Sequence, residues 1–283
     1  MWFSKLKDEI QSGAHKDITD TEGIILEDYL SNYVYFRLGN MFTVDVSKPV
    51  LVLIAHFESN EPKIFDRWEV LRDFFHDLLQ KSMKNAGNWK NSSTKDLLKI
   101  DFQDRSLQLS NSNLYLGSKV ESFLTQLGLT RDSIEIQSWL EGVRKFYIEA
   151  LEKTVKYFKP SLLSKSLRYM DIINPMSFIE YELDVLKSRY KYIAEKFPNI
   201  IPKKDLPDLL DQVASMTVQK SIIEAVTVMS AEEFFGKLAT FKGGRYKLVA
   251  LLGQALLTIH NSSTQAERDF SVQVDFVDIF LIL

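Results

Sequence analysis

A long amphipathic run at residues 134–158 limits what this chain can fold into more than any other feature. Its apolar residues recur at intervals of three and four, the spacing that places them on one face of an α-helix. Thr130 and Ser133 precede the run as start signals, and Pro160 predicts its end because proline lacks the backbone N–H that a helix interior needs. The buried face is predicted to contain Ile136, Trp139, Leu140, Val143, Phe146, Ala150, Leu151 and Phe158.

Most of the remaining chain is also predicted to be helical, because glycine and proline are scarce. The 283 residues include 11 glycines and 7 prolines, which favours long helices over strands joined by turns. Further helices are predicted at 64–83, 117–127, 178–197 and 246–260. Ser230, followed three residues later by Glu233, has the form of a capping box that starts another helix.

Two regions give weaker signals. Residues 84–113 are rich in asparagine and serine, and they are interpreted as a loop with one short buried segment. Residues 1–49 form a poorly defined N-terminal segment, in which 24–38 fits either a helix or an edge strand. The β-branched residues of 41–57 suggest strand character.

The tryptophans at 68 and 139 lie at helical spacing and are interpreted as core residues rather than base-stacking platforms.

Composition excludes several classes of function. Lysine and arginine total 35 against 38 aspartate and glutamate residues, a formal charge of -3, so bulk charge does not hold this chain to DNA or to an anionic membrane. Cysteine is absent, which excludes disulfides, thiolate zinc sites and cysteine nucleophiles.

No run reaches the roughly 18 apolar residues of a membrane span. The N-terminus is too charged for a signal peptide. A soluble intracellular protein without membrane contact is expected.

Residues 230–271 resemble the C-terminal region of hAT-type transposases. Glu233, Phe234 and Phe235 stand where that family has its acidic-aromatic helix start. The apolar helix and the turn after it follow in the family's order. The motif that closes the region is matched by Ala266, Glu267, Arg268, Phe270 and Ser271, with Asp269 departing from the usual apolar residue. Upstream segments with the family's order and spacing extend the resemblance over roughly 50–273.

This resemblance implies a ribonuclease-H-like core that is interrupted by a large helical insertion. Three acidic residues of such a core hold two divalent metals for phosphoryl transfer, and Glu267 matches the third acid. The other two acids belong to strands that precede the insertion and have no counterpart here. Asp45 is the one tempting substitute, and it is interpreted as structural or surface. We therefore expect no catalysis and no cofactor, because the ancestral Mg or Mn site is incomplete.

The resemblance also places a dimerising region at the C-terminus, where the chain departs from the family and is expected to be truncated. The apolar segment 272–283 and the helix before it are expected to need a partner, which would be a second copy or an intact relative. DNA stays open as a partner, and the resemblance implies a nuclear location. The residues assigned to dimerisation are Leu248, Leu252, Leu256, Ile259 and Phe270.

The sequence thus predicts a mostly α fold with three parts: an N-terminal segment at 1–49, a helical insertion-like region at 50–229, and a truncated ribonuclease-H-like (α/β) dimerisation fragment at 230–283. The predicted function is that of a catalytically inactive transposase-derived protein acting through dimerisation or partner binding, with residual DNA association left open. The main alternative is an unrelated all-helical adaptor that binds other proteins. An active nuclease, whose metal-dependent DNA cleavage would be lost in Glu267→Gln, is the least favoured.

Overall fold

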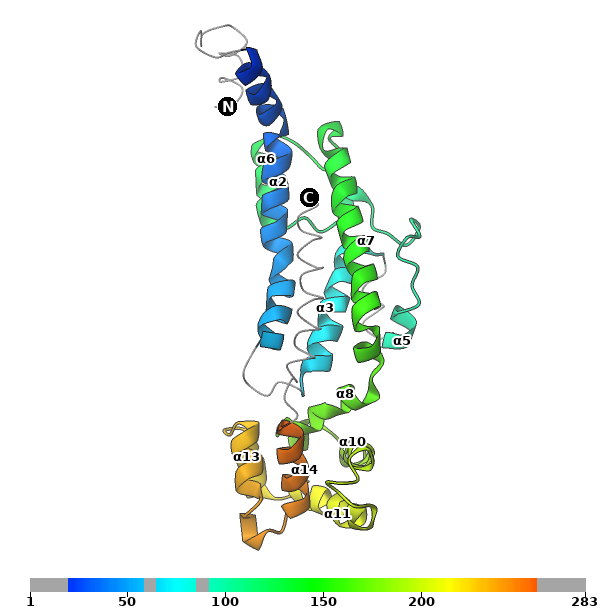
Figure 1. The fold of residues 1–283 in the computed structure, drawn as a ribbon, viewed down its shortest axis with the longest axis vertical. Coiled ribbons are helices and arrows are strands. Elements are labelled where there is room, and N and C mark those ends of the chain that lie inside the picture. Colours follow the sequence, from blue (N-terminus) through cyan, green and yellow to red (C-terminus); the bar gives the residue numbers. More distant parts are fainter. Residues whose placement is uncertain (1–19, 59–64, 85–91, 259–283) are drawn as a thin grey trace.

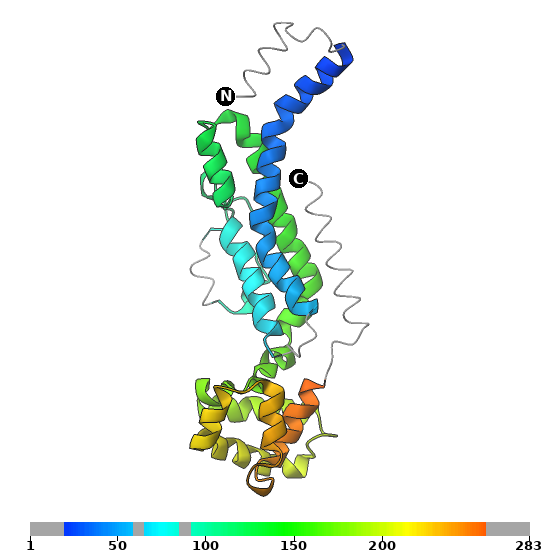
Figure 2. The same cartoon turned by 90° about the vertical axis from the view of Figure 1, so that its left-hand side faces the viewer.

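The computed structural model describes residues 20–58, 65–84 and 92–258, with side chains described from residue 33 onward, up to 56 in the first range. These residues are mostly helical, which confirms the mostly α part of the predicted fold class, while its ribonuclease-H-like (α/β) part stays a prediction. Within the described ranges there is no β-strand, and Met83 and Gln108 form an isolated antiparallel bridge. Figures 1 and 2 show an elongated helical bundle joined end to end with a smaller group of helices.

The elongated part, here called the bundle, is built on three long helices. They are α2 (Asp20–Glu58), α3 (Arg67–Ser82) and α7 (Ile134–Leu163), and α3 packs between the other two. The shorter helices α5 (Thr94–Leu97) and α6 (Ser118–Gln126) pack against α7 and α2 respectively. One continuous core runs from Leu38 to Leu162, and it includes the whole buried face predicted for α7.

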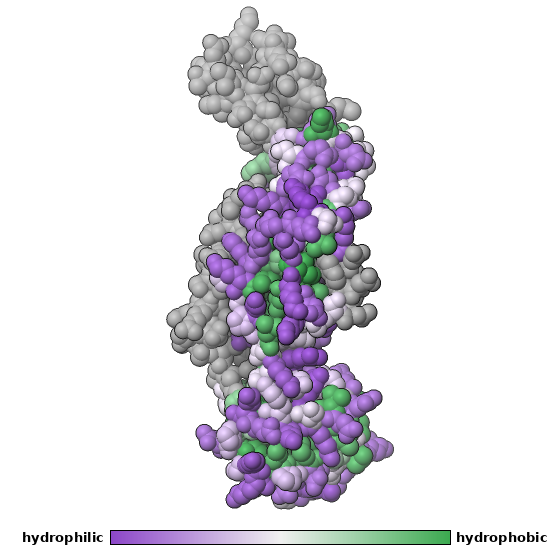
Figure 3. Space-filling model, turned by 90° about the vertical axis from the view of Figure 1, so that its right-hand side faces the viewer, coloured by the Kyte–Doolittle hydropathy of each residue, from purple (hydrophilic) through white to green (hydrophobic). Residues whose placement is uncertain are grey.

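The smaller part, here called the compact unit, has a second core that runs from Met170 to Leu257. The short helix α8 (Lys165–Tyr169) leads into it. Its helices are η2 (Met170–Ile173), α9 (Ser177–Glu180), α10 (Leu183–Lys196), η3 (Lys203–Asp205), α11 (Leu206–Thr217), α12 (Lys220–Val226), α13 (Ala231–Leu238), η4 (Phe241–Gly243) and α14 (Lys247–Leu257). On the face shown in Figure 3, apolar residues form a strip along the bundle and a second group on the compact unit, with hydrophilic residues around both.

Several predicted elements are confirmed. The capping box at the start of α13 is complete: Ser230 accepts from the Glu233 N–H, and the Glu233 carboxylate accepts from the Ser230 N–H. Helix α6 ends just before Gly128, whose φ of 69° suits glycine. Residues 92–113 are mainly loop with the buried Leu97 and Phe102, as the polar composition indicates. Residues 230–257, which the sequence analysis assigned to a separate part, pack in the same core as 170–229. Helix α2 continues across residue 49, where the sequence analysis ended the N-terminal segment.

Three predictions about secondary structure were wrong. The suggestion of strand character at 41–57 fails because this segment is part of α2, in which Leu38, Phe42 and Val46 share a buried face at four-residue spacing. Pro160 does not end α7, which continues to Leu163, because one missing N–H removes one hydrogen bond without preventing the last turn. The predicted helix 178–197 breaks at Tyr181, whose backbone is extended.

The break at Tyr181 has a tertiary cause. Its hydroxyl donates to Asp171 at 2.7 Å, and its ring lies under the Arg189 guanidinium, with the central carbon 4.2 Å from the ring centroid. Arg189 also pairs with Asp171. These contacts stabilise the extended backbone between α9 and α10, and no local sequence pattern indicates them.

Candidate functional site

The residues assigned to dimerisation or catalysis lie partly outside the described ranges. Glu267, Ile259 and Phe270 all belong to 259–283 and lie outside the residues that the structure describes. Leu252 and Leu256 are buried in the core of the compact unit, where they contact their own chain. Leu248 is partly buried and packs against the same core. The assignment of these residues to a dimer interface stays a prediction.

Asp45 has a structural role. The sequence had suggested that it is either structural or on the surface. Its side chain is buried between α2 and α6, where one oxygen accepts from Lys48 Nζ at 2.7 Å and the other from the Lys119 backbone N–H at 3.3 Å. Gly117 approaches so closely that a Cβ there would lie 2.5 Å from Asp45 Oδ2. The hydrogen bond from Lys48 lowers the pKa of Asp45 below its ordinary value, although burial opposes this. Asp45 therefore connects α2 to the start of α6.

No metal site emerges from the described residues. Among them, no group of three or more histidine, aspartate or glutamate side chains is placed to hold a metal ion.

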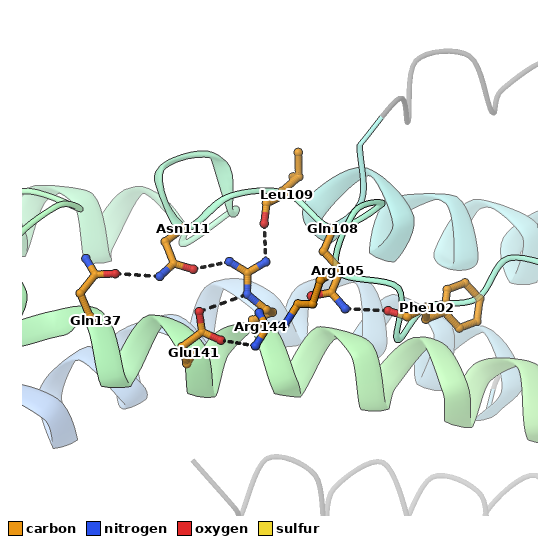
Figure 4. A network of polar contacts seen from close by, with 8 residues as sticks. All are labelled: Phe102, Arg105, Gln108, Leu109, Asn111, Gln137, Glu141 and Arg144. Carbon is orange, nitrogen blue, oxygen red and sulfur yellow. Dashed lines mark hydrogen bonds and ion pairs between the residues drawn. The ribbon is translucent and has the colours of Figure 1, made fainter.

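A polar network holds the loop 99–113 against α7 (Figure 4). The buried Arg144 guanidinium donates to the Leu109 carbonyl and to Asn111 Oδ1. Glu141 accepts from Arg105 at 2.7 Å, and this hydrogen bond lowers the pKa of Glu141. A cavity of about 460 Å³ beside the network is lined by both cations and glutamates. Its mixed charge and its hydrogen bonds within the chain indicate that it holds the loop in place.

The most unusual surface is a set of exposed apolar side chains along α2. Phe36, Leu51 and Val52 are between 58% and 64% exposed, and Val44 is about half exposed. Near Val44 the charged residues are Asp45, which is buried, and Lys48. We call the residues Phe36, Val44, Leu51 and Val52 the α2 face. Sequence reasoning missed it because the segment was interpreted as undefined or strand-like, and a helical plot of 33–56 would have displayed it.

Of the two tryptophans predicted to be core residues, Trp139 is buried in the bundle core and Trp68 is not. Trp139 packs edge-on against Phe42, with ring centroids 6.0 Å apart, as the sequence predicted. Trp68 is half-buried, and its indole N–H donates to the Leu162 carbonyl at 2.9 Å. Its ring lies beside two arginines, a contact that the sequence analysis did not anticipate.

The segment that carries the α2 face also satisfies a simple membrane criterion. Residues Tyr33–His56 are long and apolar enough to cross a membrane by length and composition, and 33% of the tested window is buried in the bundle. Core helices of soluble proteins meet the same criterion, so it does not distinguish a membrane segment from a packed helix.

Comparison with known proteins leaves this chain without an assigned family. No protein-family model, no curated protein and no solved structure matches it. The resemblance to hAT-type transposases therefore rests on the segments quoted above.

Proposed function

We propose that this protein acts by self-association, with the α2 face as the contact between two copies of the chain. The observation that carries the proposal is the exposure of four large apolar side chains along one long helix, with Val44 and Leu51 on the same face. Apolar surface of this kind on a helix that is otherwise packed is typical of interaction sites. We also propose, from the resemblance alone, that the chain is a catalytically inactive descendant of a transposase with a ribonuclease-H-like C-terminal fragment, located in the nucleus.

The arrangement of the α2 face suits an antiparallel two-fold contact. Phe36 and Val52 lie eight residues on either side of Val44, so at about 100° per residue they point about 80° to opposite sides of it, whereas Leu51 lies within about 20° of Val44. A two-fold axis at Val44 therefore places Val44 against Val44 of the partner subunit at the centre of the contact. Lys48 then faces Asn40 of the partner subunit, whereas a parallel pairing places two lysines together. The antiparallel arrangement therefore centres the contact on Val44 and Leu51 without burying like charges against each other.

The available area is sufficient for a weak dimer. The α2 face presents roughly 500 Å² of accessible surface on each chain. Because Phe36 and Val52 lie at the edges of the contact, two copies would together bury less than roughly 1,000 Å², which is in the range of weak, transient interfaces. We therefore expect a concentration-dependent dimer rather than a permanent one.

Light scattering across a concentration series tests the proposal. The wild-type chain is expected to shift from monomer to dimer, and Val52→Asp is expected to raise the dimer dissociation constant at least tenfold, about 1.4 kcal/mol. Val218→Asp is the matched control, because Val218 is 81% exposed on the compact unit, away from α2. A wild-type chain that stays monomeric throughout, or equal weakening by both substitutions, contradicts the proposal.

A deletion of residues 272–283 distinguishes the two surfaces assigned to dimerisation. If the α2 face is the contact, the deletion leaves the dimer dissociation constant unchanged. Loss of the dimer in the deletion, with no effect of Val52→Asp, would instead place the contact at the C-terminus. Circular dichroism on each variant verifies that the helices remain folded.

A further inference from the structure

A second surface, at the junction of the bundle and the compact unit, has the chemistry of an anion site. A cavity of about 360 Å³ opens between α3, α5 and α8. Among the described residues that line it are four cationic side chains and no carboxylate. The cations are Arg72, Lys95, Lys165 and Arg168.

Aromatic rings rather than carboxylates position the cations on α8. The Arg168 guanidinium carbon lies 5.1 Å from the centroid of the Trp68 ring, which the hydrogen bond to Leu162 holds in place. Lys165 Nζ lies 4.5 Å from the centroid of Tyr192. Among the described residues, neither Arg168 nor Lys165 forms an ion pair with a carboxylate. A guanidinium stacked on a ring keeps its edge N–H donors available for a planar or tetrahedral oxyanion.

Two of the nearby carboxylates are engaged mainly with groups outside the cavity, although Asp96 also interacts electrostatically with Lys95. Asp96, on α5, accepts from Ser93 Oγ and pairs with Lys99. Asp171, which follows α8, pairs with Arg189. The surplus of positive charge is also reflected in Arg189, whose pKa is lowered first by burial and then by the charge of Arg168.

We propose that this junction cavity binds the phosphate or diphosphate group of a small molecule. Within the described part of the chain, Arg168 and Lys165 have no carboxylate partner, and such cations recognise phosphate by charge-assisted hydrogen bonds, while the hydroxyls of Thr94 and Ser164 add donors at the wall. The volume lies at the lower end for small-molecule sites. A small ligand is favoured over a nucleic acid, because the formal charge of -3 gives no bulk attraction for a polyanion.

The site joins two parts of the molecule. Trp68 and Arg72 belong to the bundle, whereas Tyr169, beside Arg168, packs against the core of the compact unit. A phosphate bound between them contacts both parts at once. This proposal is independent of self-association, because none of its residues belongs to the α2 face.

Titration of the full-length protein with sodium pyrophosphate at constant ionic strength tests the site. Calorimetry is expected to show saturable binding, with Trp68 fluorescence changing in parallel and that change lost in Trp68→Phe. Arg168→Gln and Lys165→Gln are expected to weaken binding at least tenfold. Both side chains are exposed, so these substitutions spare the cores.

Matched controls come from the cavity beside α7. Arg105→Gln and Lys145→Gln remove the same two residue types from a cavity that also contains glutamates, and they are expected to leave pyrophosphate affinity within twofold of wild type. Arg168→Lys, which keeps the charge and loses the planar fork, is expected to bind with intermediate affinity.

Three outcomes would overturn the proposal. The first is no saturable binding of pyrophosphate at millimolar concentration. The second is equal weakening by the control variants, which indicates non-specific attraction. The third is tighter binding of a single-stranded oligonucleotide that is weakened by the same Arg168 and Lys165 substitutions, because this assigns the cavity to nucleic acid instead.

Discussion

Replacing Gly253 with alanine should destabilise the protein, although alanine is the better helix former. Gly253 lies in the middle of α14 and faces the ring of Phe235 on α13. A Cβ at this position would come within 3.0 Å of three atoms of that ring. Phe235 is fully buried and packs edge-on against Phe234, with ring centroids 5.2 Å apart, so its ring has no open space into which to move.

Two opposing effects set the size of the change. Alanine gains about 1 kcal/mol over glycine in a helix interior. Overpacking of a dense core costs about 1–3 kcal/mol, and an overlap this deep with an aromatic ring belongs at the upper end. The net loss of unfolding free energy should therefore be about 2 kcal/mol. Gly236→Ala is the matched control on α13, since no heavy atom lies within 4 Å of its added Cβ, and it should gain about 0.5–1 kcal/mol.

Urea denaturation of the full chain, followed by circular dichroism, measures both variants against wild type. A Phe235→Leu background gives the sharper version of the test, because a smaller side chain should accommodate the new methyl group and reduce the loss caused by Gly253→Ala. If Gly253→Ala proves as stable as wild type, or if the Phe235→Leu background leaves its cost unchanged, the packing of α14 on α13 described above is refuted.

Two further substitutions test the polar contacts of the bundle. Asp45→Ala should cost about 1–2 kcal/mol, because the Lys119 N–H at the start of α6 loses its acceptor. The pKa of Asp45 is lowered in the folded state, so its contribution to stability is present above the ordinary aspartate pKa and is lost as the pH falls through the lowered value. Urea denaturation measured from about pH 6 to pH 2 should therefore show a shallower decline of the unfolding free energy in Asp45→Ala than in wild type. Arg144→Met should cost about 1–3 kcal/mol by leaving the Leu109 carbonyl and Asn111 without their donor, whereas Lys145→Met on the exposed side of the same helix should be neutral within about 0.5 kcal/mol by the same measurement.

Periodicity was sufficient to predict the helices that bury a single continuous face. The stripe of α7 from Ile136 to Phe158 lies in the core throughout. The capping box at Ser230 was predictable for a similar reason, since its partners lie three residues apart and need no tertiary information. Such local hydrogen bonds are kept in the folded chain because the packing of the core favours the same helix.

Where tertiary contacts compete with local preference, the sequence was a poorer guide. The β-branched residues of 41–57 favour a strand by composition, yet Phe42, Val46 and Leu53 pack in the bundle core as parts of a helix. The break between α9 and α10 depends on Asp171, which lies ten residues before Tyr181. A window of local propensity does not contain either of these contacts.

The candidate surfaces differ in how far the sequence could reveal them. The α2 face is a periodic pattern within a single helix, so it was available in principle once the helix was recognised. The junction cavity was not, because Trp68 and Leu162 are brought together from positions 94 residues apart. Its cations, viewed along the sequence, look like ordinary solvated charges among nearby acids. Only the fold separates Arg168 and Lys165 from the carboxylates that neutralise their neighbours.

The two proposed surfaces depend on different physical forces, and this determines how each responds to solution conditions. Contact through the α2 face comes from burial of apolar side chains, so added salt should affect it little. Phosphate binding at the junction comes from exposed cations, whose attraction is screened as ionic strength rises. Since α2 packs on α3 and α6 whereas the cavity is closed by α5 and α8, neither surface shares a side chain with the other. Failure of one proposal therefore leaves the evidence for the other intact.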